Sequence, residues 1–480
     1  MSNFNFDNSY RKLSEKFYEE ANPFPAPHPE FLLLNKELMK ELDLETDENV
    51  LLQILSGNKI ANGSQPIAQA YAGHQFGHFT MLGDGRAVLL GEHLTDSGKR
   101  FDIQLKGSGQ TPFSRRGDGK AAVKPMLREY LMSEAIHHLN IPTSRSLAVI
   151  KTGEKVYRET VLEGAVLTRI MSSHIRVGTF EFARYFGGID HVKELMNYTI
   201  DRHFPELKSA ENPPVALLEK VMDLQMDLVI NWIRVGFIHG VMNTDNTSIA
   251  GETFDYGPCA FLGKYNPETV FSSIDTQGRY AFGNQPNIIK WNLARFAETL
   301  ISLIDPDEKK ALEIATEKIN EFDEKFTQKW YRMYASKLGM DELKEGDSQL
   351  IDEFLGLLEI QQKDYTHAFT FLRLPEIFDE NKFFLDEKFD NWISKWKQRI
   401  QNREGGKQAA FELMEKYNPV FIPRNYFVEE TLEAAVSGNL NPLNEFLEAL
   451  KNPYEFQPEN QRFLYSPDDF DAEFVTFCGT

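Results

Sequence analysis

The order in which strand and helix patterns follow one another constrains the fold of this chain more than any other feature. Between residues 74 and 165, short apolar or alternating runs such as 87–90 and 101–105 are separated by glycine-rich loops, which is typical of β-strands. After residue 165, long segments with apolar residues at helical spacing dominate, the first of them at 215–235. A small β-rich unit followed by a large helical one predicts an α+β fold of two lobes with a cleft between them.

The chain of 480 residues is too long for one simple core, so we expect cooperating units. We expect three segments, namely an N-terminal extension packing on the lobes (1–73), the small β-rich N-lobe (74–165), and the helical C-lobe with a C-terminal cysteine tail (166–480).

Several elements within the lobes are expected individually. Residues 146–157 predict a strand that turns at Thr152 and Gly153. Residues 121–139 predict a helix with Pro125 near its first turn. In the helical lobe, further helices are expected at 288–304, 309–338, 350–360, 405–417 and 428–450.

Charge and composition exclude several classes of protein. The net charge of −20 opposes general binding to nucleic acid, because a phosphate backbone attracts a basic surface. No apolar run approaches the roughly 20 residues of a membrane helix, and the polar first 18 residues match neither a secretory signal nor a transit peptide. The two cysteines are too few for a disulfide framework. We therefore expect a cytoplasmic protein, monomeric, with no nucleic-acid or membrane partner.

Basic residues are nevertheless concentrated in one segment, 86–128, which contains nine Lys or Arg and four Asp or Glu. Such an island suits a small anionic ligand, although a solvated basic face has the same pattern. Three glycine-rich loops lie in or beside it: Gly83-Asp84-Gly85-Arg86, Gly107-Ser108-Gly109-Gln110 and Arg116-Gly117-Asp118-Gly119-Lys120. A single loop of this kind is more simply a tight turn. Three of them, with Lys and Arg, offer the backbone amides and charges that a polyphosphate needs.

Lys106 ends the alternating run, and Glu129 follows on the next predicted helix, with Glu134 as a second candidate. In protein kinases a strand lysine that binds phosphate is held by a helix glutamate in this way. A surface lysine at a strand end is the alternative, so the pair needs further support.

The segment from His239 to Asn246, with the Asp-Tyr-Gly that starts at Asp255, supplies that support. His239 and Asn246 have the spacing of the kinase loop His-Arg-Asp-x-x-x-x-Asn, and Asp255 leads a variant of Asp-Phe-Gly. In kinases that Asn and that Asp bind the metal ions on the phosphates of ATP. Val241, however, stands where a kinase has its catalytic Asp, and valine cannot accept a proton.

Asp245, beside Asn246, is the nearby carboxylate on this loop. Either the base has moved to Asp245, where an ordinary pKa would leave it ionised at neutral pH, or the protein binds nucleotide without turnover. Taken alone, Asp245 is as well explained as a residue that stabilises a turn. Arg169 and Arg176, farther back in the chain, could clamp a phosphate, with interdomain salt bridges as the alternative.

Further motifs extend over nearly the whole chain: Tyr71-Ala72-Gly73-His74-Gln75-Phe76-Gly77, Gln104-Leu105-Lys106-Gly107-Ser108-Gly109, Asn284-Gln285-Pro286, Trp291-Asn292-Leu293-Ala294-Arg295, Asn418-Pro419 and Ile422-Pro423-Arg424-Asn425. In this order they resemble the selenoprotein O / YdiU family of kinase-like proteins. The resemblance implies a bilobal pseudokinase that binds ATP in the flipped orientation relative to a kinase, so that the α-phosphate faces the acceptor. It implies transfer of AMP, and in some members of UMP from UTP, to Ser, Thr or Tyr hydroxyls of proteins, with release of pyrophosphate.

The resemblance also assigns roles to single residues. It implies Asp245 as proton acceptor, Glu129 as the partner of Lys106, and Mg²⁺ or Mn²⁺ bound by Asn246 and Asp255. It implies nucleotide contacts at Gly83, Gly85, Arg86, Lys106, Asp118, Gly119, Arg169, Arg176 and Asp255. A phosphotransferase that uses Asp245 as a displaced base, and a nucleotide-binding scaffold without turnover, remain the alternatives.

The C-terminal tail departs from the family pattern. Many members have a selenocysteine or cysteine third from the end, before two serines. Cys478 keeps that position, but Gly479 and Thr480 follow it. We expect Cys478 to be a candidate redox thiol that pairs with a substrate or with Cys259, whereas Cys259 is otherwise explained as a small buried apolar residue.

Overall fold

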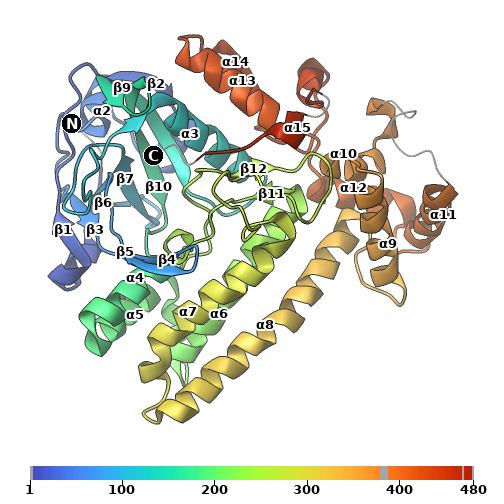
Figure 1. The fold of residues 1–480 in the computed structure, drawn as a ribbon, viewed down its shortest axis with the longest axis horizontal. Coiled ribbons are helices and arrows are strands. Elements are labelled where there is room, and N and C mark those ends of the chain that lie inside the picture. Colours follow the sequence, from blue (N-terminus) through green and yellow to red (C-terminus); the bar gives the residue numbers. More distant parts are fainter. Residues whose placement is uncertain (1–3, 379–386, 468–469, 478–480) are drawn as a thin grey trace.

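The computed structural model describes residues 4–378, 387–467 and 470–477. Its strands lie mainly in the first part of the chain and its helices mainly in the second, which confirms the α+β prediction (Figure 1). Among the described residues, no helix is both long and apolar enough to cross a membrane.

One antiparallel sheet forms the small lobe. Its strands follow the order β1 (Tyr18–Glu20), β3 (Ile67–Gln69), β6 (Ala87–Leu94), β7 (Arg100–Lys106), β10 (Val161–Met171), β9 (Arg145–Tyr157) and β2 (Glu30–Leu34), with β8 (Ala121–Ala122) paired to β10. The first 73 residues thus supply three strands of the sheet, and β10 carries the sheet past residue 165.

Helices cover both faces of this sheet, because its strands alternate their apolar side chains. Along β10, Leu167 belongs to the same buried cluster as α3 (Val123–His138), whereas Val166 belongs to the cluster of α1 (Lys36–Glu41) and α2 (Glu48–Leu55). A two-residue period of this kind is what a sheet buried on both sides requires. Pro125 lies in the first turn of α3, where its missing N–H costs no helical hydrogen bond.

The strand at 146–157 does not turn where the sequence predicted. β9 runs on to Tyr157 and pairs with β10 on both sides of Gly153, with a register shift between Lys151 and Lys155. Gly153 has φ +78°, and the pairing of β9 with β10 on both sides of it makes this position a bulge rather than a hairpin turn. The chain reverses farther on, where the amide of Arg158 donates to the carbonyl of Thr160.

The helical lobe contains helices of 4 to 30 residues. They are α4 (Val177–Phe182), α5 (Ile189–His203), α6 (Pro213–Val235), α7 (Gln285–Ile304), α8 (Glu308–Lys337), α9 (Asp347–Ile360), α10 (Tyr365–Phe371), α11 (Glu387–Gln401), α12 (Gly406–Tyr417), α13 (Asn425–Val436), α14 (Asn441–Ala449) and α15 (Phe470–Glu473). The single helix expected at 428–450 is in fact two, α13 and α14. Gly438 lies between them with φ +93°, and a proline stands in the first turn of α14.

The end of α6 positions the functional loop. Gly236 caps the helix in the left-handed conformation, and the chain enters the short strand β11 (Phe237–Ile238). β11 pairs with β12 (Ala260–Phe261), so residues 239–259 between them form one loop at the edge of the small lobe (Figure 1). A second two-stranded sheet, β4 (Ala72–Gln75) with β5 (His78–Met81), packs against this loop and against α4.

Candidate active site

A cleft of about 970 Å³ lies between the sheet of the small lobe and the 239–259 loop. The C-terminal segment also lines it, from Phe474 to Phe477. The structure brings to this cleft every predicted site residue that it describes, namely Gly83, Gly85, Arg86, Lys106, Asp118, Gly119, Glu129, Arg169, Arg176, Asp245, Asn246 and Asp255.

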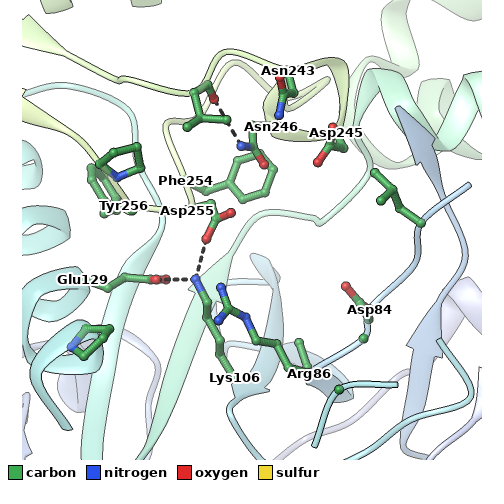
Figure 2. A pocket seen from close by; sticks show the side chains of 18 of the residues that line it. Asp84, Arg86, Lys106, Glu129, Asn243, Asp245, Asn246, Phe254, Asp255 and Tyr256 are labelled. Carbon is green, nitrogen blue, oxygen red and sulfur yellow. Dashed lines mark hydrogen bonds and ion pairs between the residues drawn. The ribbon is translucent and has the colours of Figure 1, made fainter. Parts of the chain in front are cut away.

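Lys106 lies between two carboxylates (Figure 2). It ends β7 in the middle of the sheet, paired with Ala87 on one side and Leu167 on the other. Its Nζ donates to Oε2 of Glu129 at 2.6 Å and to Oδ1 of Asp255. The strand–helix pair predicted from the sequence therefore forms, and it reaches across the cleft to the Asp-Tyr-Gly segment.

Arg169, on β10, completes a buried network with the same carboxylates. Its Nη2 lies 2.5 Å from Oε1 of Glu129 and 3.3 Å from Oδ1 of Asp255. Burial alone would raise the pKa of Glu129, but the charges of Arg169 and Lys106 outweigh it and lower that pKa. At Asp255 burial is likewise outweighed by Lys106, Arg169 and Arg86, and its pKa falls well below the usual range. Both carboxylates are therefore ionised and hold the two cations in place.

Side chains of the kinase-like loop bond to backbone carbonyls of the same loop. Nε2 of His239 lies 3.1 Å from the carbonyl oxygen of Phe254, which ties the start of the loop to the residue before Asp255. The side-chain Nδ2 of Asn246 donates to the carbonyl of Val241 at 3.1 Å. Val241 itself is buried, and Asp255 has φ +63°, which turns its side chain toward Lys106 (Figure 2).

Asp245 is a buried carboxylate on the opposite side of the cleft from Lys106 (Figure 2). Its Oδ2 accepts a hydrogen bond from Nε2 of Gln75 at 3.4 Å, and its buried Oδ1 has no hydrogen-bond partner among the described residues. Burial outweighs the charge of Arg176 and raises the pKa of Asp245 to about 6. Its pKa is thus higher than the ordinary value expected from sequence, and a group poised in this way suits proton transfer near neutral pH.

Arg176 packs behind Asp245 and between two aromatic rings. Its guanidinium lies 4.0 Å from the centroid of Tyr71 and 4.9 Å from that of Phe254. Its Nη1 donates to the carbonyl of Asp245 at 3.0 Å, and its Nη2 lies 3.9 Å from Asp84. The rings and these oxygens hold the buried cation in one orientation, with part of it lining the cleft.

The glycines of the predicted loops are required by close packing. A Cβ on Gly83 would lie 2.4 Å from the ring of Phe113, and one on Gly119 would lie 2.0 Å from the carbonyl oxygen of Gly109. Both glycines also have positive φ. These contacts bring the loop backbones to the cleft wall, where their amides can approach a ligand.

Asp118 lines the mouth of the cleft in an ion pair. Its two carboxylate oxygens accept from Nη1 and Nη2 of Arg158, at 2.8 and 3.0 Å. The hydrogen bond from Arg158 lowers the pKa of Asp118. The sequence did not single out Arg158 as part of this site.

The donors at Asn246 and Asp255 fit a hard divalent cation. Because Nδ2 of Asn246 is used within the loop, its Oδ1 is left to bind a ligand, while Oδ1 of Asp255 is taken up by Lys106 and Arg169. Magnesium commonly takes one or two protein oxygens and completes its shell with phosphate and water. Among the described residues, no group of three or more His, Cys, Asp or Glu is arranged to hold a metal ion.

Of the two cysteines, the structure describes only Cys259. Cys259 is fully buried beside the loop, and burial raises the pKa of its thiol to about 12, so it is a packed apolar residue rather than a reactive thiolate. Cys478 lies outside the described residues. The preceding segment is fixed at the cleft by Thr476, whose hydroxyl donates to the carbonyl of Pro258 at 2.7 Å.

Besides Arg158, three further contributors to the site were missed as site residues. Gln75 bonds Asp245, Asp84 lies near Arg176, and Asn243 accepts from the amide of Phe76. Gln75 belongs to the Tyr71–Gly77 motif and Asp84 stands between two singled-out glycines, so a signal was present for both. Their roles depend on contacts with residues more than 90 positions away, which the local sequence does not show.

A strand lysine paired with a helix glutamate, facing a loop with His239, Asn246 and Asp255, is the arrangement of a kinase-like protein. The family model "Protein adenylyltransferase SelO" matches residues 1–451, and the chain belongs to that family. It is 50% identical to "Protein nucleotidyltransferase YdiU" of Geobacillus kaustophilus over 99% of each chain. It is equally similar to the protein of that name from Bacillus mycoides, over 99% of this chain and 98% of the relative. The chain is therefore a protein nucleotidyltransferase.

A comparison with solved structures gave a match of low TM-score. It is ROP2 from Toxoplasma gondii, a virulence factor with a protein-kinase fold and no enzymatic activity. The match has 10% identity and a TM-score of 0.23, over 75% of this chain and 94% of ROP2, and so low a score carries no weight for the fold.

Proposed function

We propose that this chain transfers AMP from ATP, or UMP from UTP, to Ser, Thr or Tyr hydroxyls of proteins and releases pyrophosphate, in a reaction that depends on Mg²⁺ or Mn²⁺. Its membership of an adenylyltransferase family and its 50% identity to named protein nucleotidyltransferases support the reaction class. The acceptor hydroxyls, the choice of nucleotide and the metal are the part that we propose.

The observation that carries the proposal is that Val241 cannot act as a base, whereas the nearby Asp245 can. Valine stands at the position of the kinase base, and Asp245, four residues on, presents a buried carboxylate to the same cleft. A base displaced from the kinase position suits a nucleotide whose α-phosphate, rather than its γ-phosphate, faces the acceptor.

The proposed step is a displacement at the α-phosphorus. Asp245 accepts the proton of the acceptor hydroxyl while the hydroxyl oxygen forms a bond to the α-phosphorus. The bond from that phosphorus to the oxygen bridging to the β-phosphate breaks, and pyrophosphate leaves with the bond electrons. Lys106, Arg86 and Arg176 offer positive charge to the phosphates, because they line the cleft as fixed or buried cations.

A divalent metal ion bound by Asn246 and Asp255 would supply further positive charge to the phosphate oxygens. The low pKa of Asp255 supports this assignment, since an ionised carboxylate is the form that binds Mg²⁺ or Mn²⁺. Asp118, Gly83, Gly85 and Gly119 are proposed as the nucleotide contacts at the cleft wall.

One labelling experiment separates this function from its two alternatives. The chain is incubated with Mn²⁺ or Mg²⁺ and ATP labelled at either the α- or the γ-phosphate, and label on protein is followed. We expect transfer of the α-label alone. Transfer of the γ-label would identify a phosphotransferase, and no transfer with either metal would identify a nucleotide-binding scaffold.

We also propose that the protein acts as a monomer in the cytoplasm, on proteins rather than on nucleic acid. The net charge of −20 supports the last point, because it opposes contact with a phosphate backbone.

A further inference from the structure

Backbone amides of the β4–β5 hairpin donate hydrogen bonds to side chains of the loop that carries Asp245. The amide of His74 donates to Oγ1 of Thr244 at 2.7 Å, and the amide of Phe76 donates to Oδ1 of Asn243 at 3.1 Å. The hairpin and the loop are about 170 positions apart in the chain. The two residues just before Asp245 are thus fixed by the end of β4 and by the turn that follows it.

Glu181, on α4, joins the same hairpin to the same loop. Its Oε2 accepts from the hydroxyl of Thr244 at 2.6 Å, and its Oε1 shares a hydrogen bond of 2.5 Å with Nδ1 of His74. Glu181 is 1% exposed, so both bonds are shielded from water. The hydroxyl of Thr244 consequently accepts from one element and donates to the other.

The packing around this network leaves Asp245 little freedom. A Cβ on Gly73 would lie 2.5 Å from Oδ1 of Asp245, and a Cβ on Gly178 would lie 2.0 Å from the carbonyl oxygen of Ala72. The strand, the helix and the loop therefore touch without intervening side chains. Gln75 adds a direct hydrogen bond to the other oxygen of Asp245.

We propose that Glu181, Thr244 and His74 form a positioning network that fixes the Asp245 carboxylate for proton acceptance. None of the three touches the nucleotide-binding wall of the cleft, and they act through the backbone beside Asp245. The inference rests on the proposed function, because it takes Asp245 as the base. A misplacement of about 1 Å is enough to slow a reaction about 100-fold.

Thr244→Val tests the network with little change in volume, since it removes the hydroxyl that both partners use. Thr244→Ser keeps the hydroxyl and serves as the conservative rescue, and Glu181→Ala removes the partner on α4. Asp347→Ala is the matched control, because Asp347 is a buried carboxylate that is paired with Arg399 in the helical lobe, away from the cleft.

The rate is measured with ATP labelled at the α-phosphate and Mn²⁺, using β-casein and the chain itself as acceptors. Affinity for the nucleotide is measured by calorimetry with α,β-methylene-ATP, which cannot be cleaved at the reacting bond. We expect Thr244→Val and Glu181→Ala to slow transfer by about 10- to 100-fold, with nucleotide affinity within about twofold of the unaltered chain. Thr244→Ser and Asp347→Ala should transfer label at nearly the unaltered rate. A variant that combines Thr244→Val with Glu181→Ala should be no slower than the slower of these two single variants, because both remove the same network.

Two kinds of result would overturn the positioning network while leaving the proposed function intact. One is a Thr244→Val variant that transfers at the unaltered rate. The other is a result that indicates general destabilisation. Either Thr244→Ser or Asp347→Ala would then lose as much rate as Thr244→Val, or Thr244→Val would lose nucleotide affinity to the same extent as rate. The proposed function fails separately if the unaltered chain transfers only γ-label or none, or if Asp245→Ala keeps full transfer, and the network then falls with it.

Discussion

The side-chain amide of Asn246 donates a hydrogen bond of 3.1 Å to the carbonyl of Val241, across the loop where a kinase has its base. This hydrogen bond therefore stabilises the loop, although the position of the kinase base holds a valine. Asp245 then lies beside the proposed metal ligand and opposite Lys106 (Figure 2). This hydrogen bond thus fixes the proposed metal ligand one residue from the proposed base.

Asp255→Ala should abolish transfer. The variant removes a proposed metal ligand and leaves Lys106 and Arg169 without one of their carboxylate partners. We expect the rate of α-label transfer to fall by more than about 100-fold. Unchanged activity would refute the assignment of the site. Circular dichroism and thermal unfolding, measured alongside, show whether the variant is folded.

Glu129→Gln should destabilise the fold and weaken nucleotide binding. Glu129 is 2% exposed and holds both Lys106 and Arg169, so a neutral side chain leaves two buried cations with one carboxylate. Breaking a buried pair of this kind costs about 3 kcal/mol or more, measured as the free energy of unfolding in urea. Glu20→Gln is the control, because the Glu20 side chain is 79% exposed in its ion pair with Arg11, and its loss should cost less than about 1 kcal/mol.

Gly73→Ala should slow transfer because it displaces the proposed base, Asp245. The added methyl would lie 2.5 Å from Oδ1 of Asp245 and must displace that carboxylate. We expect transfer to slow by about tenfold or more while nucleotide affinity is kept. Gly356→Ala adds the same methyl within α9, where no atom lies within 4 Å, and it should leave activity unchanged and raise stability by about 0.5–1 kcal/mol.

Glu252 should make stability depend on pH. Burial raises its pKa from 4.5 to about 7, against the opposing hydrogen bonds from Ser172. Below pH 4.5 the carboxyl is protonated in both states, and between pH 4.5 and 7 only the unfolded chain releases the proton. The contribution of this group to folding therefore falls as pH rises, by up to about 3 kcal/mol by pH 7, and is constant above that.

Urea unfolding at a series of pH values measures this dependence. Glu252→Gln cannot ionise, so its free energy of unfolding should fall less steeply than that of the unaltered chain between pH 5 and 7. Parallel curves for the two proteins would show that Glu252 does not titrate as inferred.

Local patterns predicted much of the fold because they record which face of an element is buried. The alternation in 101–105 and the helical spacing in 215–235 both correspond to elements of the structure, β7 and α6. The same patterns failed at Gly153 and Gly438. A glycine with positive φ serves a bulge, a turn or a helix end equally well, and only the pairing of neighbouring strands or helices decides between them.

The sequence by itself determined the α+β division, the order of the kinase-like motifs and the absence of a carboxylate at Val241, since each depends only on residue identity and spacing. The tertiary structure decided the rest. It joined Lys106 to Glu129 and Asp255, placed Arg158 on Asp118, bonded Gln75 to Asp245, and packed Asp245 closely against the glycines of β4 and α4. These contacts join positions that lie from 23 to 170 residues apart, and burial in the assembled cleft, rather than any local pattern, raises the pKa of Asp245.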